Sequence, residues 1–177
     1  VGVHTGAGTA KGRDVPITAR GAYEGSRVIR VNAGGLFGLN PGLYFVDVIA
    51  DGTWRIELTQ PRWDEGDPLP VSSSGRGDQV IGPIQLTAGS LPLKVTHNGS
   101  EPFIVELLKG YATGEKVTPE MEPPNAVINL SGQVDETTSV KVNPAAMANF
   151  AGFRGIFEDI YAIVIRADGD WTLSLGE

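Results

Sequence analysis

Apolar and polar residues alternate along most of this chain, and this two-residue period limits its possible folds more than any other feature. Clusters of Gly, Pro, Asn and Asp interrupt the alternation about every eight to fifteen residues. A period of two places alternate side chains on one face of a strand, and the 3.6-residue period of a helix is scarce here. The pattern predicts an all-β fold, and we expect an antiparallel β-sandwich of about eleven strands.

Residues 43–59 carry the clearest local signal for a hairpin. Two alternating stretches are joined there by Asp51-Gly52, a dipeptide that tolerates the positive φ angles of a tight turn. The side chains expected on the inner faces are Tyr44, Val46, Val48, Trp54, Ile56 and Leu58.

The same pattern recurs at the C-terminus, in residues 161–175. A shift of 117 positions (171 minus 54) aligns the two stretches, with Asp51-Gly52 matching Asp168-Gly169. A second shift, of 111 positions, matches Gly21 with Gly132. We interpret the match as an internal duplication, with Trp54 and Trp171 as core residues of equivalent hairpins.

The duplication suggests an organisation into three parts. Residues 1–62 form a partial first repeat, residues 63–78 an exposed connector rich in Pro and Ser, and residues 79–177 a complete second repeat. Within the second repeat, the turn at 97–100 predicts another hairpin, with Leu91, Leu93, Val95, Phe103, Val105 and Leu107 facing inward. Two modules side by side, or one sandwich built from both segments, fit the sequence equally well.

Composition excludes several classes of function. With 21 acidic and 14 basic residues the formal charge is −7, which disfavours a phosphate-binding surface, so we expect no nucleic-acid partner. No apolar run approaches the about 20 residues of a spanning helix, so we expect no membrane insertion. The chain has no cysteine, which excludes disulfides and thiol chemistry. It begins at Val1, so we expect a piece of a longer product.

Catalytic and metal motifs are weak in this sequence. His97 precedes Asn98-Gly99, a setting that predicts a solvent-facing histidine beside a turn and not a general base. Asp51 and Asp168 fit carboxylates that bond local turn backbone. We predict no catalytic residue, no metal ligand and no cofactor, with structural calcium as the alternative at two acidic groups. These groups are Asp64, Glu65 and Asp67, and Glu158, Asp159, Asp168 and Asp170.

The connector supplies the candidate binding residues. Trp63 lies between Arg62 and Asp64, where its ring can contact a partner or pack against a neighbouring module. Arg76-Gly77-Asp78 forms the tripeptide that integrins recognise on flexible loops, although Arg and Asp around a Gly turn need no receptor. The candidate binding residues are Trp63, Asp64, Asp67, Arg76 and Asp78.

Four short strings carry a resemblance to a known class of proteins: residues 82–89 (GPIQLTAG), 96–103 (THNGSEPF), 130–132 (LSG) and 167–171 (ADGDW). They resemble β-sandwich repeats of secreted or surface-tethered bacterial proteins. In outline the chain is also similar to bacterial pre-peptidase C-terminal domains and to jelly-roll carbohydrate-binding modules. The resemblance spans residues 79–177 and repeats over 15–60. It implies a jelly-roll-like fold, an extracellular or cell-surface location, and a binding, spacer or adhesion role.

These observations favour a non-enzymatic extracellular module that acts as a spacer, an adhesion unit or a ligand-presenting unit. Its partner would be a surface polymer or a protein, and edge strands could pair copies into homo-oligomers. The alternative is a glycan-binding accessory domain of a larger secreted enzyme, with exposed aromatics such as Trp63, Tyr23, Tyr111 or Phe153 on one surface. A hydrolase that uses acidic residues is the third reading.

Overall fold

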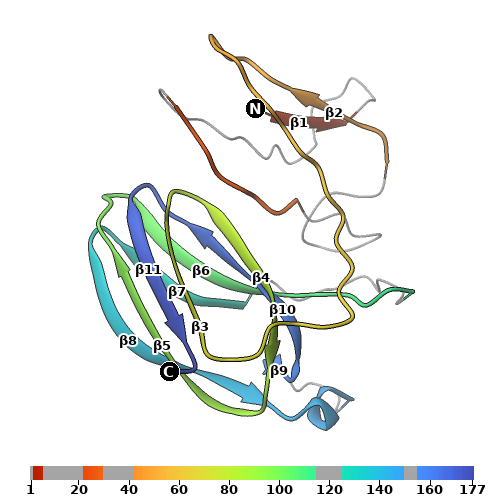
Figure 1. Cartoon of the computed structure of the whole chain (residues 1–177), viewed down its shortest axis with the longest axis vertical. Coiled ribbons are helices and arrows are strands. Elements are labelled where there is room, and N and C mark those ends of the chain that lie inside the picture. The colour runs from red at the N-terminus through yellow and green to blue at the C-terminus, as the bar shows by residue number, and fades with distance from the viewer. Residues whose placement is uncertain (1, 6–21, 30–41, 115–124, 150–154) are drawn as a thin grey trace. The chain divides into compact units, whose positions relative to one another are not determined.

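A computed structural model describes residues 2–5, 22–29, 42–114, 125–149 and 155–177, and in these the fold is all-β with eleven strands (Figure 1). The chain divides into two compact units. Unit 1 comprises Val1–Tyr23, Ile29–Pro61 and Lys116–Pro123, and unit 2 comprises Glu24–Val28, Arg62–Glu115 and Pro124–Glu177. Within the described ranges, no helix combines the length and the apolar character needed to span a membrane.

Unit 2 contains a four-stranded antiparallel sheet. Strand β10, flanked by β4 and β6, is central, and β7 lies beyond β6 (Figure 1). The strands are β4 (Gln79–Leu86), β6 (Pro102–Lys109), β7 (Asn125–Ser131) and β10 (Asp159–Arg166).

The second sheet of unit 2 has five strands in the order β3-β11-β5-β8-β9. All its pairs are antiparallel except β8–β9, a parallel pair next to a 3-10 helix at Ala145–Asn149. The predicted connector, residues 63–78, lies within unit 2 and contributes β3 to this sheet. The strands are β3 (Val71–Arg76), β5 (Gly89–His97), β8 (Val134–Asn143), β9 (Ile156–Phe157) and β11 (Asp170–Leu175).

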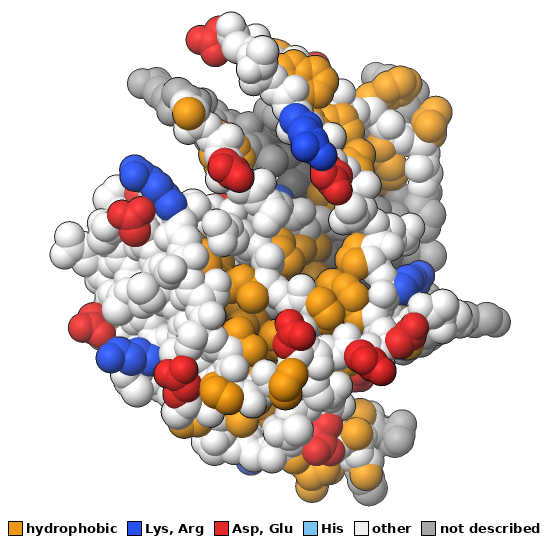
Figure 2. All heavy atoms as spheres, in the orientation of Figure 1, with side chains coloured by type: hydrophobic (Ala, Val, Ile, Leu, Met, Phe, Trp, Pro, Cys, Tyr) orange, Lys and Arg blue, Asp and Glu red, His pale blue; other side chains and the backbone are white. Residues whose placement is uncertain are grey.

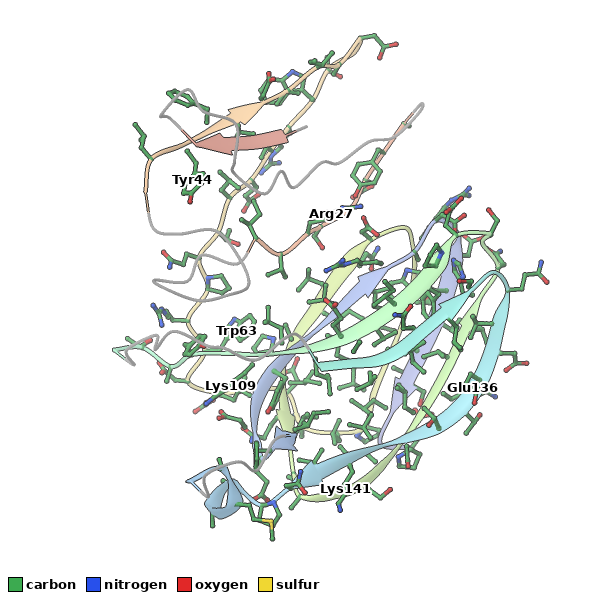
Figure 3. All side chains as sticks on the ribbon, turned by 180° about the vertical axis from the view of Figure 1, so that it is seen from behind. Arg27, Tyr44, Trp63, Lys109, Glu136 and Lys141 are labelled. Carbon is green, nitrogen blue, oxygen red and sulfur yellow. The ribbon has the colours of Figure 1, made fainter. Side chains whose placement is uncertain are left out.

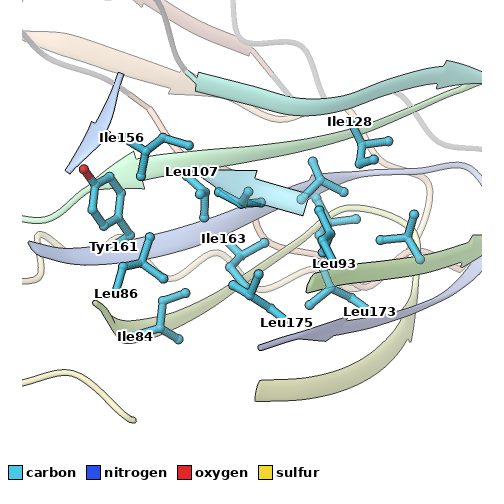
Figure 4. Close-up of a cluster of buried hydrophobic side chains, with 14 of the residues drawn as sticks. Ile84, Leu86, Leu93, Leu107, Ile128, Ile156, Tyr161, Ile163, Leu173 and Leu175 are labelled. Carbon is cyan, nitrogen blue, oxygen red and sulfur yellow. The ribbon is translucent and has the colours of Figure 1, made fainter. Parts of the chain in front are cut away.

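The inward side chains of both sheets form one hydrophobic core (Figure 4). Alternation fills it: Tyr161, Ile163 and Ile165 enter from β10, and Trp171, Leu173 and Leu175 enter from β11. The predicted inward positions Leu93, Val95, Phe103, Val105 and Leu107 are confirmed, since all are buried in this core.

The two hairpins predicted within unit 2 are wrong. Strand β10 belongs to the four-stranded sheet and β11 to the five-stranded sheet, so residues 167–169 cross between sheets. The link 98–101 crosses between β5 and β6 in the same way. We call such a link an arch. Alternation shows which side chains face the core but not which strand lies alongside, and a hairpin and an arch place the same residues inward.

Unit 1 contains a sheet of two short strands, β1 (Gly2–Thr5) and β2 (Tyr44–Asp47), paired antiparallel. The predicted hairpin over 43–59 is wrong, because β2 pairs with β1 and residues 54–59 form no strand. Trp54, predicted to lie in a core, is 61% exposed. The sequence match between 44–58 and 161–175 is therefore not accompanied by similar local structure.

Candidate functional site

Four arches meet at one end of unit 2 (Figure 1). Each links a strand of one sheet to a strand of the other, at residues 77–78, 98–101, 132–133 and 167–169. Each arch contains a glycine, and the conformational freedom of glycine permits the sharp turn that such a short link requires. This end of the unit brings together polar residues that lie far apart along the chain.

Backbone hydrogen bonds tie the arches to one another in a row. Gly77 N donates to Gly169 O over 3.1 Å, which joins arch 77–78 to arch 167–169. Asn98 N donates to Asp170 O over 3.0 Å, next to that same arch. Gly132 N donates to Glu101 O over 3.3 Å and so adds arch 132–133 on the far side.

The carboxylate of Asp168 is the central polar group of this row. Its Oδ2 accepts hydrogen bonds from Ser100 N at 3.0 Å, Ser100 Oγ at 3.1 Å and Glu101 N at 3.1 Å. Burial has the largest single effect on the pKa of Asp168 and raises it, but the hydrogen bonds together outweigh burial. The pKa therefore lies below its ordinary value of 3.8, and the group is held as a carboxylate.

His97 lies directly beneath this carboxylate, and the prediction that it faces solvent is wrong. It is 3% exposed, its ring stacks on Phe103 with centroids 4.8 Å apart, and Nδ1 lies 3.0 Å from Gly132 O. Nε2 lies 3.1 Å from Asp168 Oδ1. The carboxylate thus stands between the serine hydroxyl and the imidazole. A nucleophilic triad needs the imidazole between the other two groups, so this order does not activate Ser100.

Two glycines allow the neighbouring arches to approach this closely. A Cβ on Gly169 would lie 2.5 Å from Gly99 N and 2.8 Å from Gly99 Cα. A Cβ on Gly99 would fall on the Asp168 carboxylate and 2.5 Å from His97 Nε2. Larger residues at either position would therefore force the arches apart.

A shallow depression of about 540 Å³ opens among the arches. All four arches or their adjoining strand ends contribute to its lining: Arg76, Asn98, Gly99, Ser100, Gly132, Gln133, Asp168 and Gly169. Arg76 is exposed, and its guanidinium Nε lies 3.9 Å from Asp170 Oδ1. The lining therefore combines a cation, a carboxylate, two amides and a hydroxyl, of which the Asn98 amide and the Ser100 hydroxyl already bond Asp170 and Asp168.

Arg76 and Asp78, two predicted binding residues, have different environments although they stand two positions apart. Arg76 borders the depression. Asp78 is 5% exposed, and its carboxylate accepts hydrogen bonds from Arg27 Nε at 2.6 Å and from Ala167 N at 3.1 Å. Arg27 Nη2 also contacts this carboxylate (Figure 3 labels Arg27). The Asp78 carboxylate thus anchors a neighbouring segment and is not displayed for a receptor.

The other three predicted binding residues lie elsewhere in unit 2. Trp63 is partly buried, and a Cβ on Gly110 would come within 2.5 Å of its ring, so the indole lies against that backbone (Figure 3). Asp64 Oδ1 accepts a hydrogen bond from Thr113 N at 2.9 Å. Asp67 bonds strand β4 through its backbone, with its N donating to Pro83 O. The structure thus brings only Arg76 of the five to the depression.

The acidic groups considered for calcium are separately engaged. Glu158 accepts hydrogen bonds from Ala88 N and Ala145 N, which lower its pKa, and Asp159 contacts Lys109 Nζ at 2.9 Å. Asp170 accepts a hydrogen bond from the Asn98 side chain at 3.0 Å. In the described part of the chain, no three His, Asp or Glu residues are grouped so as to hold a metal ion.

Sequence reasoning missed Asn98, Ser100, Gln133 and Asp168 as members of one site. The available signal was that each lies in or beside a Gly-containing turn between alternating stretches, since such turns gather at the ends of sheets. Comparisons with protein-family models, with curated proteins and with solved structures find no match for this chain.

Proposed function

We propose that this chain is a non-catalytic extracellular β-sandwich module that presents its arch end to a polymer or protein on a surface. In this proposal unit 2 is a jelly-roll-like sandwich, and the match between 44–58 and 161–175 is the trace of a duplicated module. One observation carries the functional part. Two groups at the arch end are suited to acid–base chemistry, and both contact neighbouring arches: His97 Nδ1 lies 3.0 Å from Gly132 O, and the Asp168 carboxylate accepts hydrogen bonds from Ser100 and Glu101.

The exposed residues at the rim of the depression do not connect one arch to another. Arg76 and Gln133 stand on the outer arches of the row, and both are exposed. A rigid frame with exposed polar groups on its loops suits recognition, because little conformational entropy is lost when a ligand binds. The remaining role, as a spacer, needs only the frame.

Binding of the full chain to immobilised polysaccharides and extracellular proteins tests this proposal. We expect the wild-type chain to bind and the affinity of the double variant Arg76→Ala/Gln133→Ala to be at least about tenfold lower. A tenfold loss corresponds to about 1.4 kcal/mol, the free energy of one good polar contact. Lys94→Ala is the matched control, since Lys94 is exposed on β5 outside the depression. Unchanged binding by the double variant would show that the depression is not the binding site. Turnover of an immobilised substrate would contradict a non-catalytic role. Absence of binding to any of these molecules would reject recognition and favour a role as a spacer.

The glycan-binding alternative gains one specific observation from the structure. Tyr23, Phe45 and Trp54 are exposed aromatics, and sugars stack on such rings. Phe153, another aromatic considered for this role, lies outside the described residues. Affinity electrophoresis with soluble polysaccharides separates the alternatives. Retardation that is lost in Trp54→Ala but kept in Arg76→Ala/Gln133→Ala would place a glycan on unit 1.

A further inference from the structure

Strand β4 stands at the edge of the four-stranded sheet, and in the described part of the chain no strand lies on its outer side. Its eight residues, Gln79–Leu86, include no charged side chain, and Ile84 and Leu86 enter the core. Figure 2, in the orientation of Figure 1, shows hydrophobic side chains near the centre of unit 2, in the region that β4 crosses. An uncharged, apolar edge of this kind is a template on which another chain can form strand hydrogen bonds.

The segment Glu24–Val28, which we call the seal segment, covers the first part of this edge. Ser26 N donates to Asp78 O over 3.1 Å, and Val80 N donates to Ser26 Oγ over 2.9 Å. Val80 N therefore points away from the sheet, to the side where an added strand would bond. The seal segment thus occupies groups that such a strand would otherwise use.

An ion pair holds the seal segment in place. Arg27 Nε donates to Asp78 Oδ2 over 2.6 Å. Asp78 is 5% exposed, and its other carboxylate oxygen accepts a hydrogen bond from Ala167 N at 3.1 Å. Hydrogen bonds between two charged groups are about twice as strong as those between neutral groups. The side chain of Arg27 therefore fixes its neighbour Ser26 against the edge.

A second contact covers the later part of the edge. Asp67 N donates to Pro83 O over 2.9 Å, and Gln85 N donates to Asp67 O over 2.8 Å. The two backbones are so close that a Cβ on Gly66 would lie 2.7 Å from Gln85 N. Pro83 has no N–H, so it offers no donor to another strand. The outer side of β4 is thus covered near both of its ends.

We propose that the seal segment prevents self-association, and that its release lets β4 of one copy pair antiparallel with β4 of a second copy. A second copy fits because two identical edge strands can pair across a two-fold axis, and neither carries a charge that would repel the other. The seal segment is the part that can leave. It forms no strand, and its chain neighbours on both sides belong to unit 1. This inference does not depend on the ligand of the arch end.

Sedimentation velocity of the full chain over a range of concentrations tests the seal. The variant Arg27→Ala/Asp78→Asn removes the ion pair without leaving a buried charge unpaired. We expect it to associate at least about tenfold more tightly than the wild-type chain, in which few copies have a free edge. The matched control is Arg166→Ala/Glu106→Gln, which removes an ion pair between β10 and β6, away from the edge. No gain in the first variant overturns the proposal, as does an equal gain in the control.

A further substitution, Val80→Pro, identifies the surface that associates. Proline removes the N–H that faces Ser26, and an edge strand tolerates proline where the N–H points outward. Added to Arg27→Ala/Asp78→Asn, it should lower association towards the wild-type level, because the freed edge then lacks a donor. Association that persists undiminished would run through another surface and reject pairing by β4.

Hydrogen exchange at low concentration tests the seal without association. In Arg27→Ala/Asp78→Asn the Val80 amide should exchange at least about tenfold faster, because Ser26 no longer covers it. The Gln85 amide, which bonds Asp67 O, should keep its wild-type rate. An unchanged rate at Val80 would show that the ion pair does not hold the seal segment. Equal acceleration at both amides would show that the whole strand has loosened, and either result rejects the proposal.

Discussion

Residues 44–58 and 161–175 carry nearly the same pattern of side chains in opposite environments. Trp171 is 2% exposed and its counterpart Trp54 is 61% exposed. Leu175 and Leu58 differ in the same way, at 1% and 68%. The comparison teaches that alternation makes a segment suitable for a core, while burial depends on the strands available beside it.

The flanking strands account for the difference. In unit 2, β10 lies between β4 and β6, and β11 lies between β3 and β5. In unit 1, β2 has β1 as its one described neighbour, and the residues that match β11 form no strand. The two residues of a matched pair are of the same type but have different surroundings. The difference between the stability effects of substituting them therefore reports the contribution of those surroundings.

The tryptophan pair gives the largest expected contrast. Trp171→Ala should lower the free energy of unfolding by about 3–5 kcal/mol, because it empties a core site and removes the hydrogen bond from Nε1 to Gly77 O. Trp54→Ala should change it by no more than about 0.5 kcal/mol in the monomer. Urea unfolding followed by far-UV circular dichroism at low protein concentration measures both.

Similar losses in the two tryptophan variants would contradict this contrast. A loss of several kcal/mol in Trp54→Ala at low concentration would mean that this indole is buried within the monomer. A small loss of unfolding free energy in Trp171→Ala would mean that the core of unit 2 rearranges to fill the cavity left by the indole.

The glycine pair should give the next largest contrast. In Gly169→Ala the new methyl would press on the backbone of Gly99, so we expect a loss of about 1–3 kcal/mol from overpacking. In Gly52→Ala the methyl meets nothing within 4 Å, and stability should stay the same or rise slightly. Thermal unfolding of both variants checks this, and equal melting temperatures would show that the two arches are not held in contact.

The aspartate pair should differ by less. Asp168→Ala leaves Ser100 N and Glu101 N without their acceptor, and because Asp168 is about one-third exposed, water replaces part of the loss. We expect a cost of about 1 kcal/mol, against a change within about 0.5 kcal/mol for the exposed Asp51→Ala. Urea unfolding at neutral pH measures the difference, and an Asp51→Ala loss as large as that of Asp168→Ala would place Asp51 in an equivalent set of bonds.

The class of fold was predictable from the sequence, but strand partners were not. The inward positions of residues 93–107 and 161–175 follow from alternation alone. Alternation does not identify neighbours, so the arches at 98–101 and 167–169 were predicted as hairpins. Strand β3 was missed for another reason. Its three serines suggest a linker, yet an edge strand with one side toward solvent tolerates such polar residues.

The candidate site was predictable in part for a similar reason. Arg76 was identified because it stands in a recognisable tripeptide. Asp168 was expected to bond its own turn, and its carboxylate does bond its own backbone, but it also bonds the arch at 98–101, almost 70 positions away. His97 was expected in solvent because Asn-Gly follows it. Contacts between separate turns depend on how the strands of the two sheets are arranged, and no local pattern encodes that arrangement.

Acid gives the smallest and most specific contrast between the two segments. The pKa of Asp168 is lowered on folding, so the folded state binds its proton more weakly than the unfolded state does. The stability linked to Asp168 is therefore fully present above its ordinary value of 3.8 and is lost as pH falls through the lower, folded value. Glu158 and Glu177 also have lowered pKa values and add to the same loss.

The free energy of unfolding of the wild-type chain should thus change little from neutral pH down to about 5 and then fall as the pH drops further. Asp168→Asn should make this acid-dependent fall shallower, because one of the contributing carboxylates is gone, and Asp51→Asn should keep the wild-type slope. Urea unfolding at a series of pH values compares the three chains. If Asp168→Asn leaves the slope unchanged, the arch hydrogen bonds do not favour the ionised carboxylate, and the two aspartates are equivalent after all.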